Sequence, residues 1–238
     1  MAVRALIFDF DGLILDTETP EVAVWSAIYA EHGQPYPMED WSQIIGGWGN
    51  SHFDPAATLQ EKVPTTLELG ALRSRHREES DALILRSPVM EGVTEVLAAA
   101  KRMGLRCAIA SSSERAWVEP HLRRLGLLAH FEKIITGDEV PKGRTKPHPD
   151  VYLKALAELR LGPREILVFE DSPNGIQAAH AAGLRVLGVP NPVTASLRMD
   201  ADLVLGSLAE LPLEEILRRM DGPAAGPGMP RAVPDAAA

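Results

Sequence analysis

The 238-residue chain is 45% hydrophobic and 24% charged, which is typical of a globular protein that buries a core without disulfide bonds. Its formal net charge of −9 argues against a nucleic-acid partner, because binding a polyanion requires clustered Lys and Arg. No run of about 20 uncharged apolar residues predicts a membrane span, and the first residues do not resemble a signal peptide, so we expect a cytoplasmic protein, monomeric by default.

Short apolar runs recur along the chain and predict the buried strands of a sheet. Segments with helical periodicity lie between most of them. Residues 93–103, for example, place their apolar side chains on one face, and Gly104 ends that helix. This alternation predicts an α/β fold, a doubly wound Rossmann-like parallel sheet with helices on both faces. The predicted strands are residues 3–8, 106–110, 133–136, 166–169, 185–188 and 202–205, and further predicted helices are 149–159 and 175–182.

Residues 16–87 break this alternation. They are charged and helix-like, clearest at 21–32 and 67–85, and they contain no convincing strand. We therefore expect a helical cap over 16–87, inserted into a catalytic core formed by 1–15 and 88–220. A cap at that place would lie over the carboxyl ends of the strands, where open α/β sheets bind ligands. The tail 221–238 is rich in Gly, Pro and Ala and is expected to be disordered.

Polar side chains stand at or just beyond the ends of several predicted strands, or in the loop before a helix. In a parallel sheet these ends meet at one edge, so the groups can converge on one crevice. Carboxylates gathered in this way need a cation or bound protons to offset their repulsion, and oxygen ligands suit Mg²⁺. The candidate residues are Asp9 and Asp11, Ser111, Lys146, and Glu170 with Asp171.

Each of these residues also has a plainer explanation. Asp11 and Gly12 could form an ordinary turn with a solvated carboxylate. Lys146 could be a surface lysine, and Lys142 is its rival for a place in the site. Ser111 could cap a helix, with Glu114 completing a capping box. A strand-to-helix turn at Ser111 would equally serve as an anion site, and there we assign it the phosphoryl group.

Taken together, four segments in order along the chain resemble the haloacid dehalogenase superfamily, in its phosphatase and β-phosphoglucomutase-like branch. They are DFDGLILDT at 9–17, IASSS at 109–113, KPHPD at 146–150 and FEDSPNGI at 169–176. Each segment is only moderately specific, but the ordered set spreads over nearly the whole chain. The single cysteine, Cys107, lies outside these segments in an apolar run and is expected to be a buried structural thiol.

The resemblance implies a role for each matching residue. Asp9 would attack phosphorus and become an aspartyl phosphate. Asp11 would protonate the leaving oxygen and then accept a proton from the hydrolytic water. Ser111 and Lys146 would stabilise the charge of the transferring phosphoryl group. The implied Mg²⁺ ligands are the Asp9 carboxylate, the Asp11 backbone carbonyl and Asp171, with Glu170 binding directly or through water.

Residues in the first segment and in the expected cap indicate which branch of the family the chain resembles. An acid at Asp11 disfavours the dehalogenases, whose leaving halide needs no proton. β-Phosphoglucomutase activity is also in doubt, because Glu21 stands where that enzyme has a cap histidine and Gly49 stands where it has a phosphate-binding arginine. A cluster of arginines on another predicted helix could supply a replacement for the missing phosphate-binding arginine. We favour the plainer explanation that these arginines form a solvated basic face. That cluster is Arg73, Arg75 and Arg77.

We therefore expect a phosphomonoester hydrolase that acts on a small phosphorylated metabolite. The alternatives are a phosphosugar mutase with the same site and a catalytically silent module that binds a phosphorylated metabolite. Trp25 is expected to pack in the cap core, whereas Trp48, flanked by glycines, could face the cleft. The expected substrate contacts are Ser111, Ser112, Lys146, Glu21 and Trp48.

Overall fold

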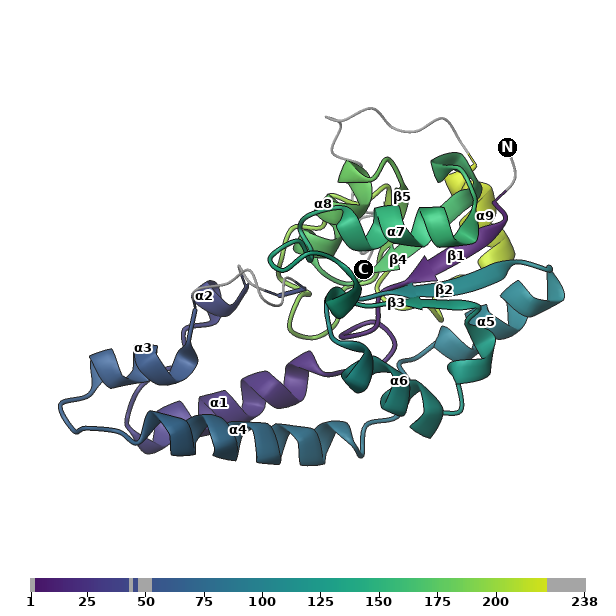
Figure 1. The fold of residues 1–238 in the computed structure, drawn as a ribbon. Coiled ribbons are helices and arrows are strands. Elements are labelled where there is room, and N and C mark those ends of the chain that lie inside the picture. The colour runs from purple at the N-terminus through teal and green to yellow at the C-terminus, as the bar shows by residue number, and fades with distance from the viewer. Residues whose placement is uncertain (1–2, 43–44, 47–52, 222–238) are drawn as a thin grey trace, which may run out of the picture.

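The computed structural model describes residues 3–42, 45–46 and 53–221, and within them a six-stranded parallel sheet forms the centre of the molecule (Figure 1). The strands follow the order β3-β2-β1-β4-β5-β6, and each pairs in parallel with its neighbours. The predicted fold class and all six predicted strands are confirmed. The strands are β1 (Ala5–Phe8), β2 (Arg106–Ala110), β3 (Lys133–Ile135), β4 (Ile166–Glu170), β5 (Arg185–Gly188) and β6 (Leu203–Val204).

The central strands are buried on both faces, which explains their uninterrupted apolar sequences. In the register, Phe8 of β1 lies beside Ile109 of β2 and Phe169 of β4. The Phe8 and Phe169 rings stack with centroids 4.7 Å apart. This register brings Asp9 level with Glu170, so the polar residues that follow β1 and end β4 share one edge of the sheet.

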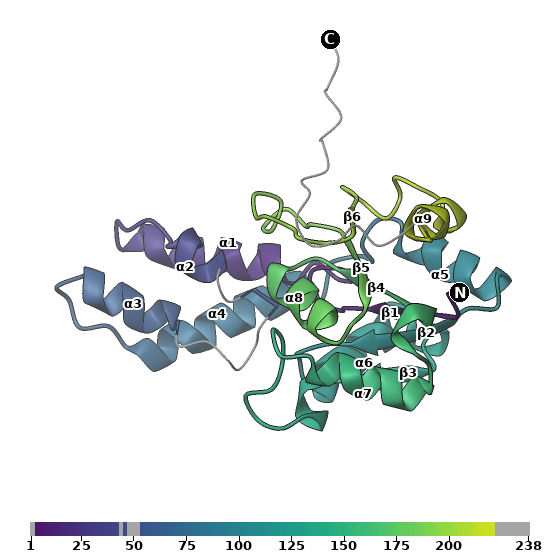
Figure 2. The same ribbon diagram turned by 90° about the horizontal axis from the view of Figure 1, so that it is seen from above.

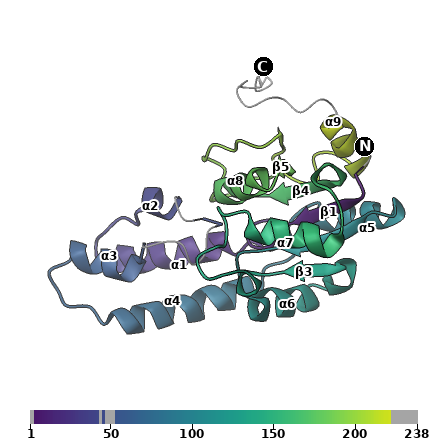
Figure 3. The same ribbon diagram turned by 45° about the horizontal axis from the view of Figure 1, so that its top comes forward.

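Helices cover both faces of the sheet and bury separate apolar clusters against it. On one face pack α5 (Val93–Arg102), α6 (Arg115–Arg124) and α9 (Leu213–Met220). Figure 3 shows α7 (Asp150–Leu159) and α8 (Pro173–Ala181) together on the other face. Three short 3₁₀ helices complete this part of the chain: η1 (Leu128–His130), η2 (Gly137–Glu139) and η3 (Pro163–Glu165).

The helical segment, residues 18–84, extends away from the sheet (Figures 1 and 2). Helices α1 and α4 pack side by side, and this segment has a small core of its own that includes Trp25, Ile28 and Tyr29. The predicted helices 21–32 and 67–85 are present, and the packing role of Trp25 is confirmed. The division into core and cap stays a prediction. The helices are α1 (Glu18–Glu31), α2 (Met38–Ser42), α3 (Pro55–Lys62) and α4 (Leu69–Ile84).

The turn between β2 and α6 corrects one expectation, because Ser111 is not a helix cap. Helix α6 begins at Arg115, with Glu114 as an extended N-cap residue that makes no side-chain capping bond. The Ser111 hydroxyl instead accepts a 2.9 Å hydrogen bond from the Ser113 backbone N–H. The capping box proposed for Ser111 and Glu114 is therefore wrong: Ser111 directly follows the strand and is too far from the helix to cap it.

Two further expectations can be compared with the fold. Cys107 is buried in β2, as predicted for a structural thiol. In the part of the chain that the structure describes, no helix has the length and apolar composition needed to cross a membrane. Most of the tail 221–238 lies outside the described residues.

Candidate active site

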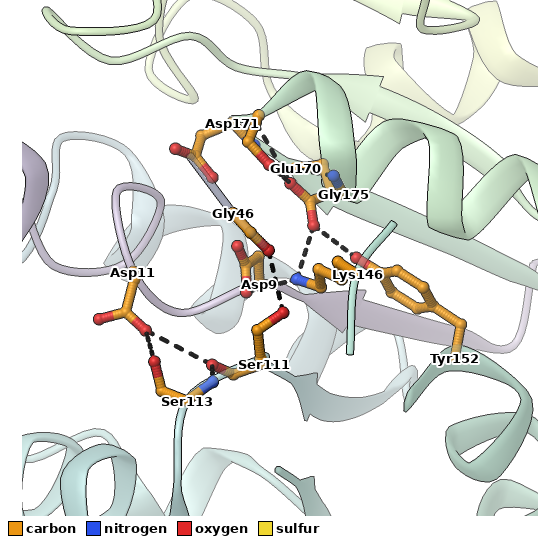
Figure 4. Close-up of polar contacts among 12 residues, drawn as sticks. Asp9, Asp11, Gly46, Ser111, Ser113, Lys146, Tyr152, Glu170, Asp171 and Gly175 are labelled. Carbon is orange, nitrogen blue, oxygen red and sulfur yellow. Dashed lines mark hydrogen bonds and ion pairs between the residues drawn. The ribbon is translucent and has the colours of Figure 1, made fainter. Parts of the chain in front are cut away.

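The centre of the site is a buried lysine between two carboxylates, at the carboxyl ends of β1 and β4 (Figure 4). Lys146 Nζ lies 2.6 Å from Asp9 Oδ1 and 2.7 Å from Glu170 Oε1. Burial lowers the pKa of Lys146, but the charges of Asp9 and Glu170 raise it by more than burial lowers it. The pKa of Lys146 therefore lies above its usual value. The lysine therefore stays an ammonium group. Its rival from the sequence, Lys142, is exposed to solvent.

Glu170 is held at both of its oxygens. Its Oε1 accepts hydrogen bonds from Lys146 Nζ and from the Tyr152 hydroxyl, the latter at 2.6 Å. Its Oε2 accepts three more, from the Asp171 backbone and from the backbone and hydroxyl of Ser172. Gly175 makes room for this carboxylate, since a Cβ there would lie 1.8 Å from Oε1. The first turn of α8 and the glutamate thus pack as one unit.

Asp171 is held at one oxygen only. Its Oδ2 accepts a 2.7 Å hydrogen bond from Asn191 Nδ2, while Oδ1 is buried without a hydrogen-bond partner among the described residues. The amide orientation of Asn191 is fixed because its Oδ1 accepts bonds from the backbone of Val193 and Thr194. An orphaned buried carboxylate oxygen is costly and points to a missing partner.

A divalent cation would fit as this missing partner. Asp9, Glu170 and Asp171 each present a carboxylate oxygen, and these three oxygens lie within 4.8 Å of one another. Burial and the charge of Glu170 raise the pKa of Asp9 to about 7, although Lys146 lowers it. Burial and the charges of Glu170 and Asp9 raise the pKa of Asp171 well above its usual range. Oxygen donors that repel one another in a buried place are suited to a hard cation such as Mg²⁺.

Asp11 lies on the other side of the nucleophile candidate and faces the turn after β2 (Figure 4). Its Oδ2 accepts hydrogen bonds from Ser113 Oγ at 2.6 Å and Ser111 Oγ at 3.4 Å, and its Oδ1 accepts one from Trp117 Nε1 at 2.8 Å. The structure therefore brings Asp11 and Ser111 together, beside the group formed by Asp9, Lys146, Glu170 at the end of β4, and Asp171 just after it.

Comparison with known proteins agrees with this geometry. The family model described as haloacid dehalogenase-like hydrolase matches residues 6–189, which is most of the chain. The chain belongs to this family. It is 41% identical to YhcW of Bacillus subtilis over 220 residues, 92% of this chain and 98% of that protein. It is 32% identical to a phosphorylated carbohydrates phosphatase of Thermotoga maritima, over 90% of this chain and 97% of that protein.

Solved structures support the same assignment. The crystal structure of CbbY from Rhodobacter sphaeroides in complex with phosphate superimposes with a TM-score of 0.67 at 29% identity, over 88% of this chain and 96% of that one. The haloacid dehalogenase-like family and its phosphatase relatives identify the chain as a hydrolase of phosphate esters.

The remaining predicted contacts of this haloacid dehalogenase-like hydrolase lie toward the helical segment. Ser112 Oγ donates a 2.9 Å hydrogen bond to the backbone carbonyl of Gly46, so it links the core to that segment. Glu21 lies in the first turn of α1. Burial and the charges of Asp11 and Asp81 raise its pKa to about 8. Trp48, like Gly49, lies outside the described residues.

Two of the three arginines of the basic cluster on α4 form ion pairs, and the third, Arg77, is exposed to solvent. Arg73 forms an ion pair with Asp54, and Arg75 forms ion pairs with Glu31 and Glu79. These contacts agree with a solvated basic face, as favoured from the sequence, rather than with two cations waiting for a second phosphate.

Several polar residues of the site were not predicted. Tyr152, Asn191 and Trp117 each donate a hydrogen bond to a predicted carboxylate. Tyr152 and Trp117 look like members of apolar helix faces, and Asn191 stands in a proline-rich loop. These contacts become visible only in the folded structure, which brings together elements that are far apart in sequence. Ser113 was part of the recognised segment, but nothing in that segment indicated its bond to Asp11.

Proposed function

We propose that this phosphatase is a Mg²⁺-dependent phosphomonoester hydrolase that cleaves a small phosphorylated metabolite through an aspartyl phosphate on Asp9. The observation that carries the proposal is the pairing of Asp9 Oδ1 with the buried Lys146 ammonium beside the orphaned Oδ1 of Asp171. A nucleophilic carboxylate, a fixed cation and an open cation site are the groups that phosphoryl transfer requires.

The residues divide the reaction between them. The Asp9 carboxylate forms a bond to phosphorus as the bond from phosphorus to the leaving oxygen breaks, and Asp11 gives its proton to that oxygen. Water then attacks the aspartyl phosphate, gives its proton to Asp11, and regenerates Asp9 with release of phosphate. Lys146 and Ser111 offset the charge of the phosphoryl group throughout.

The carboxylates of Asp9 and Asp171 and the backbone carbonyl of Asp11 would hold the Mg²⁺. When bound, the ion offsets negative charge on the phosphoryl oxygens. Glu170, whose oxygens already accept five hydrogen bonds, would reach the ion only through water. Its main task in this proposal is to hold Lys146.

The mutase alternative finds less support. A mutase must hold a second phosphate, yet two of the three arginines of the α4 cluster, Arg73 and Arg75, are engaged in ion pairs, which leaves Arg77 as the remaining candidate of that cluster. Residues 43–52, of which the structure describes only 45–46, include no Lys or Arg. Incubation with β-glucose 1-phosphate and a trace of the bisphosphate tests this point. Glucose 6-phosphate that forms faster than free phosphate would favour the mutase.

A substitution of the nucleophile tests the hydrolase. Asp9→Asn should abolish release of phosphate in a screen of phosphorylated metabolites with Mg²⁺, because an amide is a poor nucleophile. Asp200→Asn is the matched control: the Asp200 side chain is exposed to solvent and pairs with the exposed Arg198, so its substitution should leave turnover unchanged. Normal activity of Asp9→Asn would remove Asp9 as nucleophile.

A further inference from the structure

The Tyr152 hydroxyl is a buried polar group that the mechanism above does not use. Tyr152 lies in α7, completely buried, with its ring in the apolar cluster between that helix and the sheet. Packing alone asks only for an aromatic ring at this place. The hydroxyl reaches out of the apolar cluster and donates its hydrogen bond to Glu170 Oε1.

Tyr152 and Lys146 share one acceptor atom. Glu170 Oε1 accepts from the phenol at 2.6 Å and from Lys146 Nζ at 2.7 Å, and Nζ lies 5.2 Å from the centre of the Tyr152 ring. Figure 4 shows the continuous path from the phenol through Glu170 and Lys146 to Asp9. The tyrosine therefore lies next to the residues that hold the nucleophile, without contacting the nucleophile through its hydroxyl.

We propose that Tyr152 is a positioning residue for phosphoryl transfer: its hydroxyl fixes Glu170 Oε1, and Glu170 in turn holds Lys146 Nζ against Asp9. The proposal rests on the proposed function, since it concerns the same site. Glu170 Oε2 is already fixed by the backbone and hydroxyl of Ser172 and by the Asp171 backbone. The phenol fixes the other oxygen, so the carboxylate has one orientation.

The same hydrogen bond also sets how strongly Glu170 attracts the lysine. A donor on Oε1 shares the negative charge of that atom, which leaves more of the Lys146 charge for Asp9 and the phosphoryl group. Without the phenol, Lys146 would move toward Glu170, and its flexible stem allows such a movement. Loss of the phenol would therefore leave less of the Lys146 charge for Asp9 and would displace the ammonium group. Both consequences lower the rate of phosphoryl transfer, and neither changes a contact to the substrate.

Tyr152→Phe tests the proposal by removing one oxygen and keeping the ring. We expect kcat with p-nitrophenyl phosphate and Mg²⁺ to fall about tenfold with KM changed less than about twofold, as for loss of one hydrogen bond to a charged group. Tyr29→Phe is the matched control, because Tyr29 is equally buried and its hydroxyl donates a 2.7 Å hydrogen bond to the Pro55 carbonyl in the helical segment. It should lose comparable thermal stability and keep full kcat.

A double-mutant cycle with Lys146→Met separates positioning from a general structural role. If Tyr152 acts through Lys146, Tyr152→Phe changes the residual kcat of Lys146→Met by less than about twofold, and the two substitutions are also non-additive in the free energy of unfolding. Equal fold-losses of kcat in both backgrounds, additive unfolding free energies, or unchanged kcat in Tyr152→Phe alone would overturn the proposal. Wild-type protein is assayed first, since absence of any phosphatase activity there would refute the proposed function instead.

Discussion

The buried carboxylates predict that Mg²⁺ stabilises this fold more strongly at about pH 8 than at about pH 5.5. Burial and the Glu170 charge raise the pKa of Asp9 from 3.8 to about 7 in the metal-free fold. Between these two values the folded protein binds a proton at Asp9 that the unfolded chain has lost. The contribution of Asp9 therefore favours the metal-free fold most at low pH and is lost as the pH rises through about 7.

The size of the effect follows from competition between the proton and the metal. At about pH 5.5 the site is about 30-fold more often protonated than ionised at Asp9, which weakens Mg²⁺ binding by about 2 kcal/mol. At about pH 8 this competition is almost absent. Since about 1 kcal/mol shifts the melting temperature of a chain of this size by about 2–4 °C, the gain from Mg²⁺ should be about 4–8 °C larger at the higher pH. The raised pKa of Asp171 acts in the same direction.

Thermal unfolding followed by circular dichroism measures this difference. The protein is melted at both pH values with about 10 mM MgCl₂ and with NaCl of equal ionic strength, so that general salt effects cancel. Asp171→Asn serves as the control, because it removes the negative charge of the carboxylate that carries the orphaned oxygen, and it should lose most of the gain at either pH. A gain from Mg²⁺ that is equal at both pH values, or larger at the acidic one, would refute the reasoning.

Two further substitutions test the supports of the site. Asn191→Ala removes the donor to Asp171 Oδ2 and should weaken Mg²⁺ binding about tenfold by titration calorimetry, whereas unchanged binding would show that Asp171 needs no orientation by Asn191. Gly175→Ala places a methyl group against Glu170 and should cost about 2 kcal/mol in urea unfolding. Gly70→Ala meets nothing within 4 Å and should cost nothing, so equal losses in the two glycine variants would contradict the close-packing argument.

The strands and the centre of the site were predictable because they depend on local sequence and on one rule of topology. Uninterrupted apolar runs mark strands that are buried on both faces, as β1 and β4 are, and all six predicted strands are present in the sheet. The meeting of parallel strand ends at one edge then places Asp9 beside Glu170 and Asp171. The position of Lys146 was less certain from the sequence, and its complete burial between two carboxylates separates it from Lys142.

The parts that escaped prediction depend on contacts between distant elements. Helix α6 has a charged sequence interrupted by Pro120, so it shows no clear apolar periodicity, yet Val118 and Leu122 are buried. Tyr152 resembles any core aromatic until the fold brings Glu170 within reach of its hydroxyl. The capping box failed for a related reason, because the spacing of Ser and Glu says nothing about where the strand ends.

Glu170 and Asp171 illustrate how adjacent residues of equal charge acquire different tasks. Glu170 is the last residue of β4, and its two oxygens accept five hydrogen bonds. Asp171 follows the strand and keeps one oxygen without a partner among the described residues. With Asp9 and Lys146, the buried group then has three carboxylates for one ammonium, and one divalent cation balances the two excess charges. Because hydrogen bonds already satisfy Glu170, that cation would be attracted mainly by Asp9 and Asp171, which would place it beside the proposed nucleophile.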